Sequence, residues 1–249
     1  MVLMMLGYCE FISAQLVDIE SQRLRNDTTR IAGIAGLAYS YKQTNDVKLT
    51  DIDASLILQL RSKNKKDILL LLGNYELLRT STQSLTNTGF GHIRFTHKFN
   101  SFLRMEAFTQ YQTNEKLNLK NRHLLGVGPR LRVFNRKNAD SALGCLYMAE
   151  WEETTDDMSG LILYHRVSSY LSFNFVIKED FCEITSITYY QPLINDFNDY
   201  RLSNNTSLHI KLLKNLGFET GVRYSFDSQP PAGVINNTFS TTMGVKYKF

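Results

Sequence analysis

The C-terminal stretch of the chain, residues 236–249, alternates strictly between two kinds of side chain and ends on an aromatic residue. Phe239, Thr241, Met243, Val245, Tyr247 and Phe249 fall on one face of an extended strand, and Ser240, Thr242, Gly244, Lys246 and Lys248 fall on the other. Apolar residues toward lipid and polar residues toward a lumen are typical of an outer-membrane β-barrel. The pattern therefore predicts the closing strand of such a barrel, with Tyr247 and Phe249 as the signal that the barrel-assembly machinery reads.

The overall composition does not by itself reveal a membrane protein. Charged residues make up 21% of the 249 residues, and alternating lipid-facing and lumen-facing side chains cancel in such an average. The longest continuous apolar run of the mature chain, Ile68 to Leu72, is far shorter than the roughly 20 residues that a spanning helix requires. The sequence therefore predicts spanning strands and excludes spanning helices.

The net charge of +4 could indicate a nucleic-acid partner. However, the Lys and Arg residues are scattered through alternating segments and do not gather on one helix or loop. We therefore predict no nucleic-acid binding. The predicted partners are outer-membrane lipid, lipopolysaccharide and the barrel-assembly machinery.

The chain divides into three parts. Residues 1–15 have the apolar stretch and small residues of a signal peptide, although no basic residue precedes the apolar part and residues 7–10 interrupt it. Residues 16–29 are polar and irregular, which predicts a periplasmic N-terminal segment. From residue 30 to residue 249 the period is two, which predicts the barrel itself in the outer membrane of a Gram-negative cell.

The alternating part predicts an all-β fold, a closed antiparallel transmembrane β-barrel of about 12 strands with both termini in the periplasm. The facing of the third strand, about Asp67–Arg79, stays ambiguous because it is apolar on both faces. Connection lengths alternate, as in barrels with short periplasmic turns and longer extracellular loops, and a soluble β-sandwich has no reason to show this. The predicted turns are 62–66, 100–101, 135–140, 178–180 and 214–215; the predicted loops are 43–46, 80–86, 113–120, 154–160, 192–199 and 227–236.

Charged side chains fall on the predicted lumen face of the fifth to eleventh strands. They are Arg104, Glu106, Arg122, Arg130, Arg132, Glu150, Glu152, Arg166, Arg201, Glu219 and Arg223. Barrels of eight strands are filled by side chains and those of sixteen or more leave an aqueous channel, so about 12 is a borderline size. One interpretation is a structural network of mutually paired charges. The alternative is a narrow pore whose excess of Arg favours small anionic solutes.

The chain offers side chains for catalysis, but they stand in no specific motif. His123, His165, Ser168, Asp156 and Asp157 could serve as parts of a lipase or protease site. Because no spacing supports that alternative, we predict that the protein is not an enzyme.

The acidic residues near the predicted loop 154–160 could hold a divalent cation together with lipopolysaccharide phosphates. They are Glu152, Glu153, Asp156 and Asp157. Their spacing does not match a calcium loop, and we predict no metal site and no cofactor. Gly126 and Gly128 do not form a phosphate-binding loop, because no helix pattern follows; we interpret them as relief of crowding in the lumen or as a bulge.

Four short stretches resemble a known family. They are RMEAFTQ at 104–110, LGVGPR at 125–130, SYLS at 169–172 and YYQP at 189–192. The chain resembles the salt-induced outer-membrane proteins, a family defined by a domain of unknown function and common in Gram-negative bacteria. This resemblance extends from about Asp18 to Phe249. The resemblance implies an outer-membrane β-barrel, but it indicates no substrate and no catalytic residue. The specific role therefore stays open, and we predict a structural or envelope-stress role.

Overall fold

The computed structural model describes most of the chain after residue 29. The described residues are Ile19 and the ranges 30–45, 47–82, 84–136, 138–155, 160–178, 181–213 and 216–247. The predicted signal peptide, the predicted periplasmic segment apart from Ile19, and Phe249 lie outside the described residues. The expectations for those parts of the chain remain predictions.

Twelve β-strands account for nearly all of the described chain. They are β1 (Ile31–Thr44), β2 (Val47–Arg61), β3 (Asp67–Thr80), β4 (Ser84–Lys98), β5 (Leu103–Asn114), β6 (Leu119–Arg136), β7 (Ala139–Thr154), β8 (Ile162–Lys178), β9 (Cys182–Pro192), β10 (Tyr200–Lys211), β11 (Leu216–Asp227) and β12 (Asn237–Tyr247). A 3-10 helix, η1 (Glu115–Leu117), joins β5 to β6. The predicted all-β class and number of strands are confirmed. Within the described ranges, no helix is both long and apolar enough to cross a membrane.

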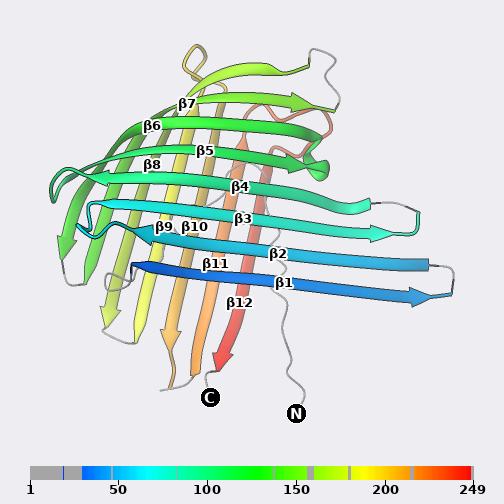
Figure 1. Cartoon of the computed structure of the whole chain (residues 1–249), viewed down its shortest axis with the longest axis horizontal. Helices are drawn as coiled ribbons and strands as arrows, with labels where there is room; N and C mark the ends of the chain where they lie inside the picture. Colours follow the sequence, from blue (N-terminus) through cyan, green and yellow to red (C-terminus); the bar gives the residue numbers. More distant parts are fainter. Residues whose placement is uncertain are drawn as a thin grey trace.

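Each strand pairs antiparallel with its neighbours in sequence, so the spatial order runs from β1 to β12. The sheet curves over on itself: β1 to β4 cross the front in Figure 1, and β8 to β12 run behind them at a steep angle. β1 and β12 stand at the two ends of the order. Backbone pairing within the described residues therefore leaves the sheet open between these two strands, and a closed barrel needs this one further pairing.

The connections fall into two groups at opposite ends of the strands. One group is short and comprises 62–66, 99–102, 137–138, 179–181 and 212–215; we call this end the turn end. The other comprises 45–46, 81–83, 115–118, 155–161, 193–199 and 228–236, and we call it the loop end. The predicted lengths of the 80–86 and 113–120 loops are wrong, because β4 already begins at Ser84, which pairs with Arg79, and because β5 extends to Asn114 and β6 begins at Leu119. The last three connections at the loop end are long, as predicted.

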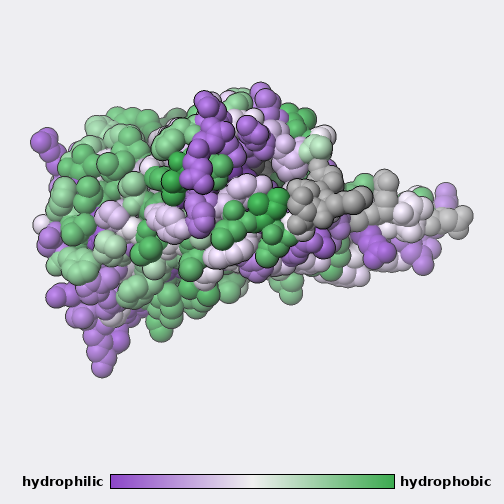
Figure 2. All heavy atoms as spheres, turned by 90° about the horizontal axis from the view of Figure 1, so that it is seen from above, coloured by the Kyte–Doolittle hydropathy of each residue, from purple (hydrophilic) through white to green (hydrophobic). Residues whose placement is uncertain are grey.

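The two faces of the sheet differ in burial and chemistry. On β6, for example, Leu124 is 8% exposed and its neighbour Leu125 is 56% exposed. We call the buried side the inner face and the other side the outer face. The outer face exposes large apolar side chains such as Val127, Tyr147 and Phe173, and Figure 2 shows broad hydrophobic areas interrupted by hydrophilic side chains. An apolar surface of this extent favours contact with lipid.

Apolar side chains also fill parts of the inner face. The larger cluster contains Phe108, Leu124, Leu146, Met148, Tyr170, Ile187 and Tyr189. A second cluster contains Leu70, Leu72 and Phe90, with Ile19 packed among them and 3% exposed. This second cluster resolves the ambiguous facing of β3: Leu70 and Leu72 point inward, where apolar partners cover them, and the intervening Leu71 points outward. Both faces of β3 are therefore apolar for different reasons: the inner side chains pack in the second cluster, and the outer ones belong to the apolar outer face.

Candidate functional site

A group of charged side chains, centred on the fully buried Glu150, lies on the inner face near the loop end. We call this group the Glu150 cluster; it contains Glu150 and Glu152 of β7, Arg122 of β6, Arg166 of β8, Arg201 of β10, Asp227 of β11 and Asp199, which directly precedes β10. Side chains alternate between the two faces of a strand, and this alternation places the cluster members that belong to strands on the inner face. The curvature of the sheet then brings β6 to β8 opposite β10 and β11.

Glu150 is the centre of the cluster and is 0% exposed. Its Oε1 lies 2.9 Å from Nε of Arg122 and 2.5 Å from Nη1 of Arg201. Its Oε2 accepts a hydrogen bond from Nε of Arg166 at 2.9 Å. Both oxygens of one carboxylate therefore receive guanidinium donors, in the strong charge-assisted geometry.

The surrounding carboxylates complete the pairing of the same arginines. Oε2 of Glu152 lies 2.5 Å from Nη2 of Arg122 and 3.1 Å from Nη2 of Arg201. Nε of Arg201 donates to Oδ2 of Asp227 at 3.0 Å, and Nη2 of Arg166 lies 2.9 Å from Oδ1 of Asp199. Four carboxylates thus meet three guanidinium groups, so each arginine has carboxylate partners and the cluster carries one more carboxylate than it has guanidinium groups.

A second buried group lies deeper along the strands. We call it the Glu106 cluster; it contains Glu106 of β5, Arg94 of β4, Arg130 of β6 and Tyr170 of β8. Nη1 of Arg94 donates to Oε2 of Glu106 at 3.0 Å, and the Tyr170 hydroxyl donates to the same oxygen at 2.8 Å. Nη1 of Arg130 donates to the Tyr170 hydroxyl at 2.9 Å. Two arginines therefore share one carboxylate, and the tyrosine connects them across the interior.

Two glycines make room for aromatic rings on the inner face, those of Phe108 in the larger apolar cluster and of Tyr170 in the Glu106 cluster. A Cβ on Gly126 would lie 2.2 Å from the ring of Phe108, and a Cβ on Gly144 would lie 2.1 Å from the ring of Tyr170. Both distances are well inside van der Waals contact, so neither position accepts a larger residue without movement of the ring. The interpretation of Gly126 as relief of crowding is correct, and Gly144 has the same role.

The remaining predicted lumen charges lie closer to the rim of the inner face. Arg132 pairs with Asp140 at 3.3 Å, and both side chains are partly exposed. Arg104 and Arg223 are half-buried on β5 and β11. Glu219 of β11 lies 3.4 Å from Nδ1 of His209 on β10. These residues extend the charged inner face toward the turn end.

The structure separates the side chains that were offered for catalysis. Ser168 is buried on the inner face and accepts a hydrogen bond from Gln191 at 2.8 Å. His165 and His123 belong to the outer face, where Nδ1 of His165 lies 2.5 Å from the Tyr147 hydroxyl. A serine and a histidine on opposite faces of one strand cannot form a nucleophile and base pair. Asp156 and Asp157 lie outside the described residues.

The proposed cation ligands are separated in the same way. Glu152 points inward into the Glu150 cluster, whereas Glu153 pairs with Lys120 and accepts a hydrogen bond from Asn121 on the other face of β7. These two carboxylates cannot share one ion, because neighbouring side chains in a strand point to opposite faces. Within the described ranges, no group of three His, Cys, Asp or Glu residues is arranged to hold a metal.

Only part of the predicted assembly signal lies within the described residues. Tyr247 is the last residue of β12, and its backbone pairs with Leu216 of β11. The side chain of Tyr247 and the whole of Phe249 are outside the described part of the chain. The role of both residues remains a prediction.

Some members of the two clusters were not among the predicted site residues. The alternation placed Arg94 and Tyr170 on the inner face, but nothing in the sequence distinguished them from other inner residues. Asp199 and Asp227 fell in or beside predicted loops, although Asp227 is 1% exposed. The missing information was the contact between strands that are not neighbours, which only the curvature of the sheet supplies.

Comparison with known proteins gives both a family and a fold. The model of a family described as "Protein of unknown function, DUF481" matches residues 35–249. A solved structure of the NanC porin is similar with a TM-score of 0.50 at 13% identity, covering 87% of this chain and 99% of that chain. A bacterial polysaccharide outer-membrane secretin is similar with a TM-score of 0.50 at 10% identity, covering 87% and 80%. The KdgM porin follows with a TM-score of 0.45 at 15% identity, covering 88% and 99%. No curated protein sequence matches the chain.

Proposed function

Because the chain belongs to the DUF481 family of proteins of unknown function and has the fold of outer-membrane porins, we propose that it closes into an outer-membrane β-barrel and passes small solutes through a narrow interior. The loop end faces the cell exterior and the turn end faces the periplasm. Outer-membrane lipid and lipopolysaccharide surround the barrel, and the barrel-assembly machinery inserts it.

Two features support closure by pairing of β1 with β12. β1 exposes both of its faces: Ile34 of the inner face is 60% exposed and Leu37 of the outer face is 81% exposed. A long apolar edge strand of this kind is not stable in water or in lipid without a partner. β1 runs toward the loop end and β12 runs away from it, so the two strands have the antiparallel directions that closure requires.

The observation that carries the pore proposal is the unequal filling of the inner face. The walls formed by β5 to β9 are occupied by the Glu150 cluster, the Glu106 cluster and apolar side chains. The inner face of β1 and β2 instead exposes polar side chains such as Ser40, Asp51 and Asp53. In a closed barrel, an off-centre path runs between the filled wall and these strands.

The charge of the filled wall determines which solutes this path favours. The three arginines of the Glu150 cluster meet four carboxylates, so this cluster does not favour anions. In the Glu106 cluster, however, Arg94 and Arg130 share a single carboxylate, which leaves an excess of positive charge. A preference for small anionic solutes therefore rests on this deeper cluster and is weaker than the number of arginines implies.

Conductance of reconstituted protein in a planar bilayer tests the proposal. We expect discrete conductance steps, and we expect the double substitution Arg130→Glu and Arg132→Glu to shift the reversal potential toward cation selectivity. A matched control is Lys120→Glu, because Lys120 is an exposed residue at the loop end of β6. The pore would be refuted if protein shown to be folded by heat-dependent gel mobility gave no conductance steps across many insertions.

A non-conducting structural barrel is the second candidate. Glu150 is fully buried and bound by three arginines, and Ile19 packs against the inner face of β3. Both features describe an interior that is filled to stabilise the fold rather than to conduct, and they fit a role in envelope stress such as a salt-induced protein would have. The same bilayer measurement separates this candidate from the pore.

A further inference from the structure

Four polar side chains form a compact group on the outer face of the sheet. They are Ser186 and Thr188 of β9 and Asn204 and Thr206 of β10, and we call them the outer polar patch. Thr188 is the register partner of Asn204, and Ser186 is the register partner of Thr206. Their inner neighbours Ile187 and Tyr189 are 4% exposed, which fixes the patch on the opposite, lipid-facing side.

The patch is held together by its own hydrogen bonds. Nδ2 of Asn204 donates to Oγ1 of Thr188 at 2.9 Å, and Oγ1 of Thr206 donates to Oδ1 of Asn204 at 3.0 Å. The hydroxyls of Ser186 and Thr206 lie 2.8 Å apart. These bonds fix the four short side chains in one flat arrangement, so the surface is ordered before any partner arrives.

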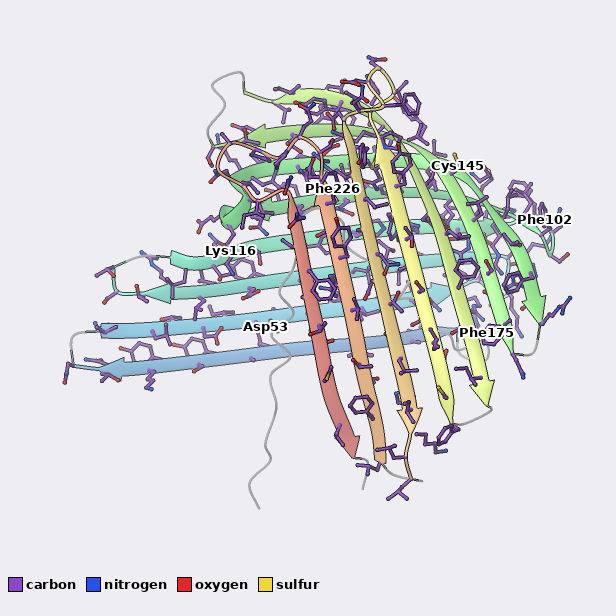
Figure 3. The ribbon with its side chains drawn as sticks, turned by 180° about the vertical axis from the view of Figure 1, so that it is seen from behind. Asp53, Phe102, Lys116, Cys145, Phe175 and Phe226 are labelled. Carbon is purple, nitrogen blue, oxygen red and sulfur yellow. The ribbon has the colours of Figure 1, made fainter. Side chains whose placement is uncertain are left out.

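The depth of the patch is set by the apolar residues on either side of it. Toward the loop end the outer face carries tilted pairs of aromatic rings, with Tyr190 against Tyr200 and Tyr200 against Phe226. Toward the turn end it carries Ile184 and Leu208, which are register partners. Figure 3 shows this side of the sheet, with Phe226 near one end of the strands and Phe175 near the other. The patch therefore lies within the apolar band, between the two interfacial regions.

Polar groups at this depth have no favourable contact with lipid. Hydrocarbon offers neither donors nor acceptors, whereas hydroxyl and amide groups can each make more than one hydrogen bond. Between transmembrane helices, Ser, Thr and Asn side chains hydrogen-bond across the contact, and the same chemistry is open to these side chains on the surface of a barrel. Hydroxyls and amides both donate and accept, so a surface made of them is complementary to itself.

We propose that the outer polar patch is the contact between two copies of this chain, related by a two-fold axis along the membrane normal. A two-fold axis along the membrane normal places the patches of both copies at the same depth in the bilayer. A different protein would have to carry a matching polar surface at that depth. The contact is isologous, with Asn204 and Thr206 near the axis. The proposal rests on the membrane position proposed above and does not depend on whether the barrel conducts.

Disulfide trapping in lipid vesicles tests the contact directly. In a background with Cys9→Ala, Cys145→Ala and Cys182→Ala, Thr206→Cys should give a disulfide-linked dimer on mild oxidation. Val127→Cys is the control, because Val127 is also an outer-face residue within a strand and is 51% exposed. We expect crosslinking at residue 206 to exceed that at residue 127 by at least about tenfold, because pairing raises the effective concentration of the thiols. Equal crosslinking at both positions would overturn the proposal.

The strength of association gives a second measurement that uses no new cysteine. Förster transfer between labelled copies, measured as the chain is diluted with lipid, reports the dimer fraction. The double substitution Asn204→Leu and Thr206→Val should weaken association by about tenfold. Thr109→Val, on the exposed outer face of β5, should leave it unchanged.

The two proposals fail in distinguishable ways. Wild type that folds in vesicles, judged by heat-dependent gel mobility, but stays monomeric at all dilutions would overturn the dimer alone. Wild type that does not insert would overturn both the dimer and the membrane position.

Discussion

Arg201 of β10 and Glu150 of β7 meet across the interior, with Nη1 lying 2.5 Å from Oε1, although β8 and β9 separate their strands in the sheet. A flat sheet would hold these strands well apart, since neighbouring strands are about 4.8 Å from one another. The contact is therefore a direct consequence of curvature. It also ties the wall formed by β6 to β8 to the wall formed by β10 and β11.

Removal of the central carboxylate should destabilise the protein strongly. Glu150→Gln leaves Arg122, Arg166 and Arg201 close together with less negative charge among them. We expect a loss of about 3–5 kcal/mol in the free energy of unfolding, as for other broken buried ion pairs. Urea titration of protein folded in detergent or vesicles, followed by tryptophan fluorescence, measures it.

Glu153→Gln is the matched control for that change. Glu153 is on the same strand but pairs with the exposed Lys120, and the loss should be far smaller than for Glu150→Gln, because exposed ion pairs contribute little to stability. Equal losses for the two variants would contradict a central role for Glu150.

The hydroxyl of Tyr170 should contribute measurably to stability. Tyr170→Phe removes the donor to Glu106 and the acceptor for Arg130 while keeping the ring. Because this leaves buried charged groups short of a partner, we expect a loss of about 1–3 kcal/mol. The same measurement on Tyr190→Phe, an outer-face residue that is 39% exposed, should show little change.

A methyl group at Gly144 should be poorly tolerated. The added Cβ of Gly144→Ala would lie 2.1 Å from the ring of Tyr170, and displacement of the ring should cost about 1–3 kcal/mol. Gly91→Ala is the control, because a Cβ there meets nothing within 4 Å. Combining Gly144→Ala with Tyr170→Ala should cost less than the sum of the two single changes, and strict additivity would rule out the clash.

The ends of the strands should differ in exposure on intact cells. In a background with Cys9→Ala, Cys145→Ala and Cys182→Ala, we expect an impermeant thiol reagent to label Thr155→Cys at the loop end and not Lys63→Cys at the turn end. Labelling of Lys63→Cys alone would reverse the proposed orientation.

The terminal aromatic residue should matter for assembly. Phe249→Ala is expected to lower the amount of folded protein in outer-membrane fractions more than Phe239→Ala does, because the predicted signal lies at the last residue. Phe239 is an exposed outer-face residue of β12, at 68%, and so controls for the loss of one lipid-facing ring. Equal yields for wild type and Phe249→Ala would remove the predicted role.

The period of two by itself determined the class of this protein, its number of strands and the facing of most side chains. Glu106, Arg130 and Arg166 were placed on the inner face from alternation alone, since the side chains of a strand have only two directions. The same rule was insufficient on β3, where both faces are apolar. There the presence of Phe90 and Ile19 on the inner side decided that Leu70 and Leu72 are buried.

Only the tertiary structure decided which charges meet. Alternation placed Arg201 and Glu150 on one face, but the two residues are 51 positions apart in sequence, and nothing in the sequence signals their contact. Asp227 reaches Arg201 because β10 and β11 pair in one register, and a shift of one residue would turn it outward. Local pattern therefore gives the face of each residue, while the pairing of its charge depends on curvature and register, which belong to the sheet as a whole.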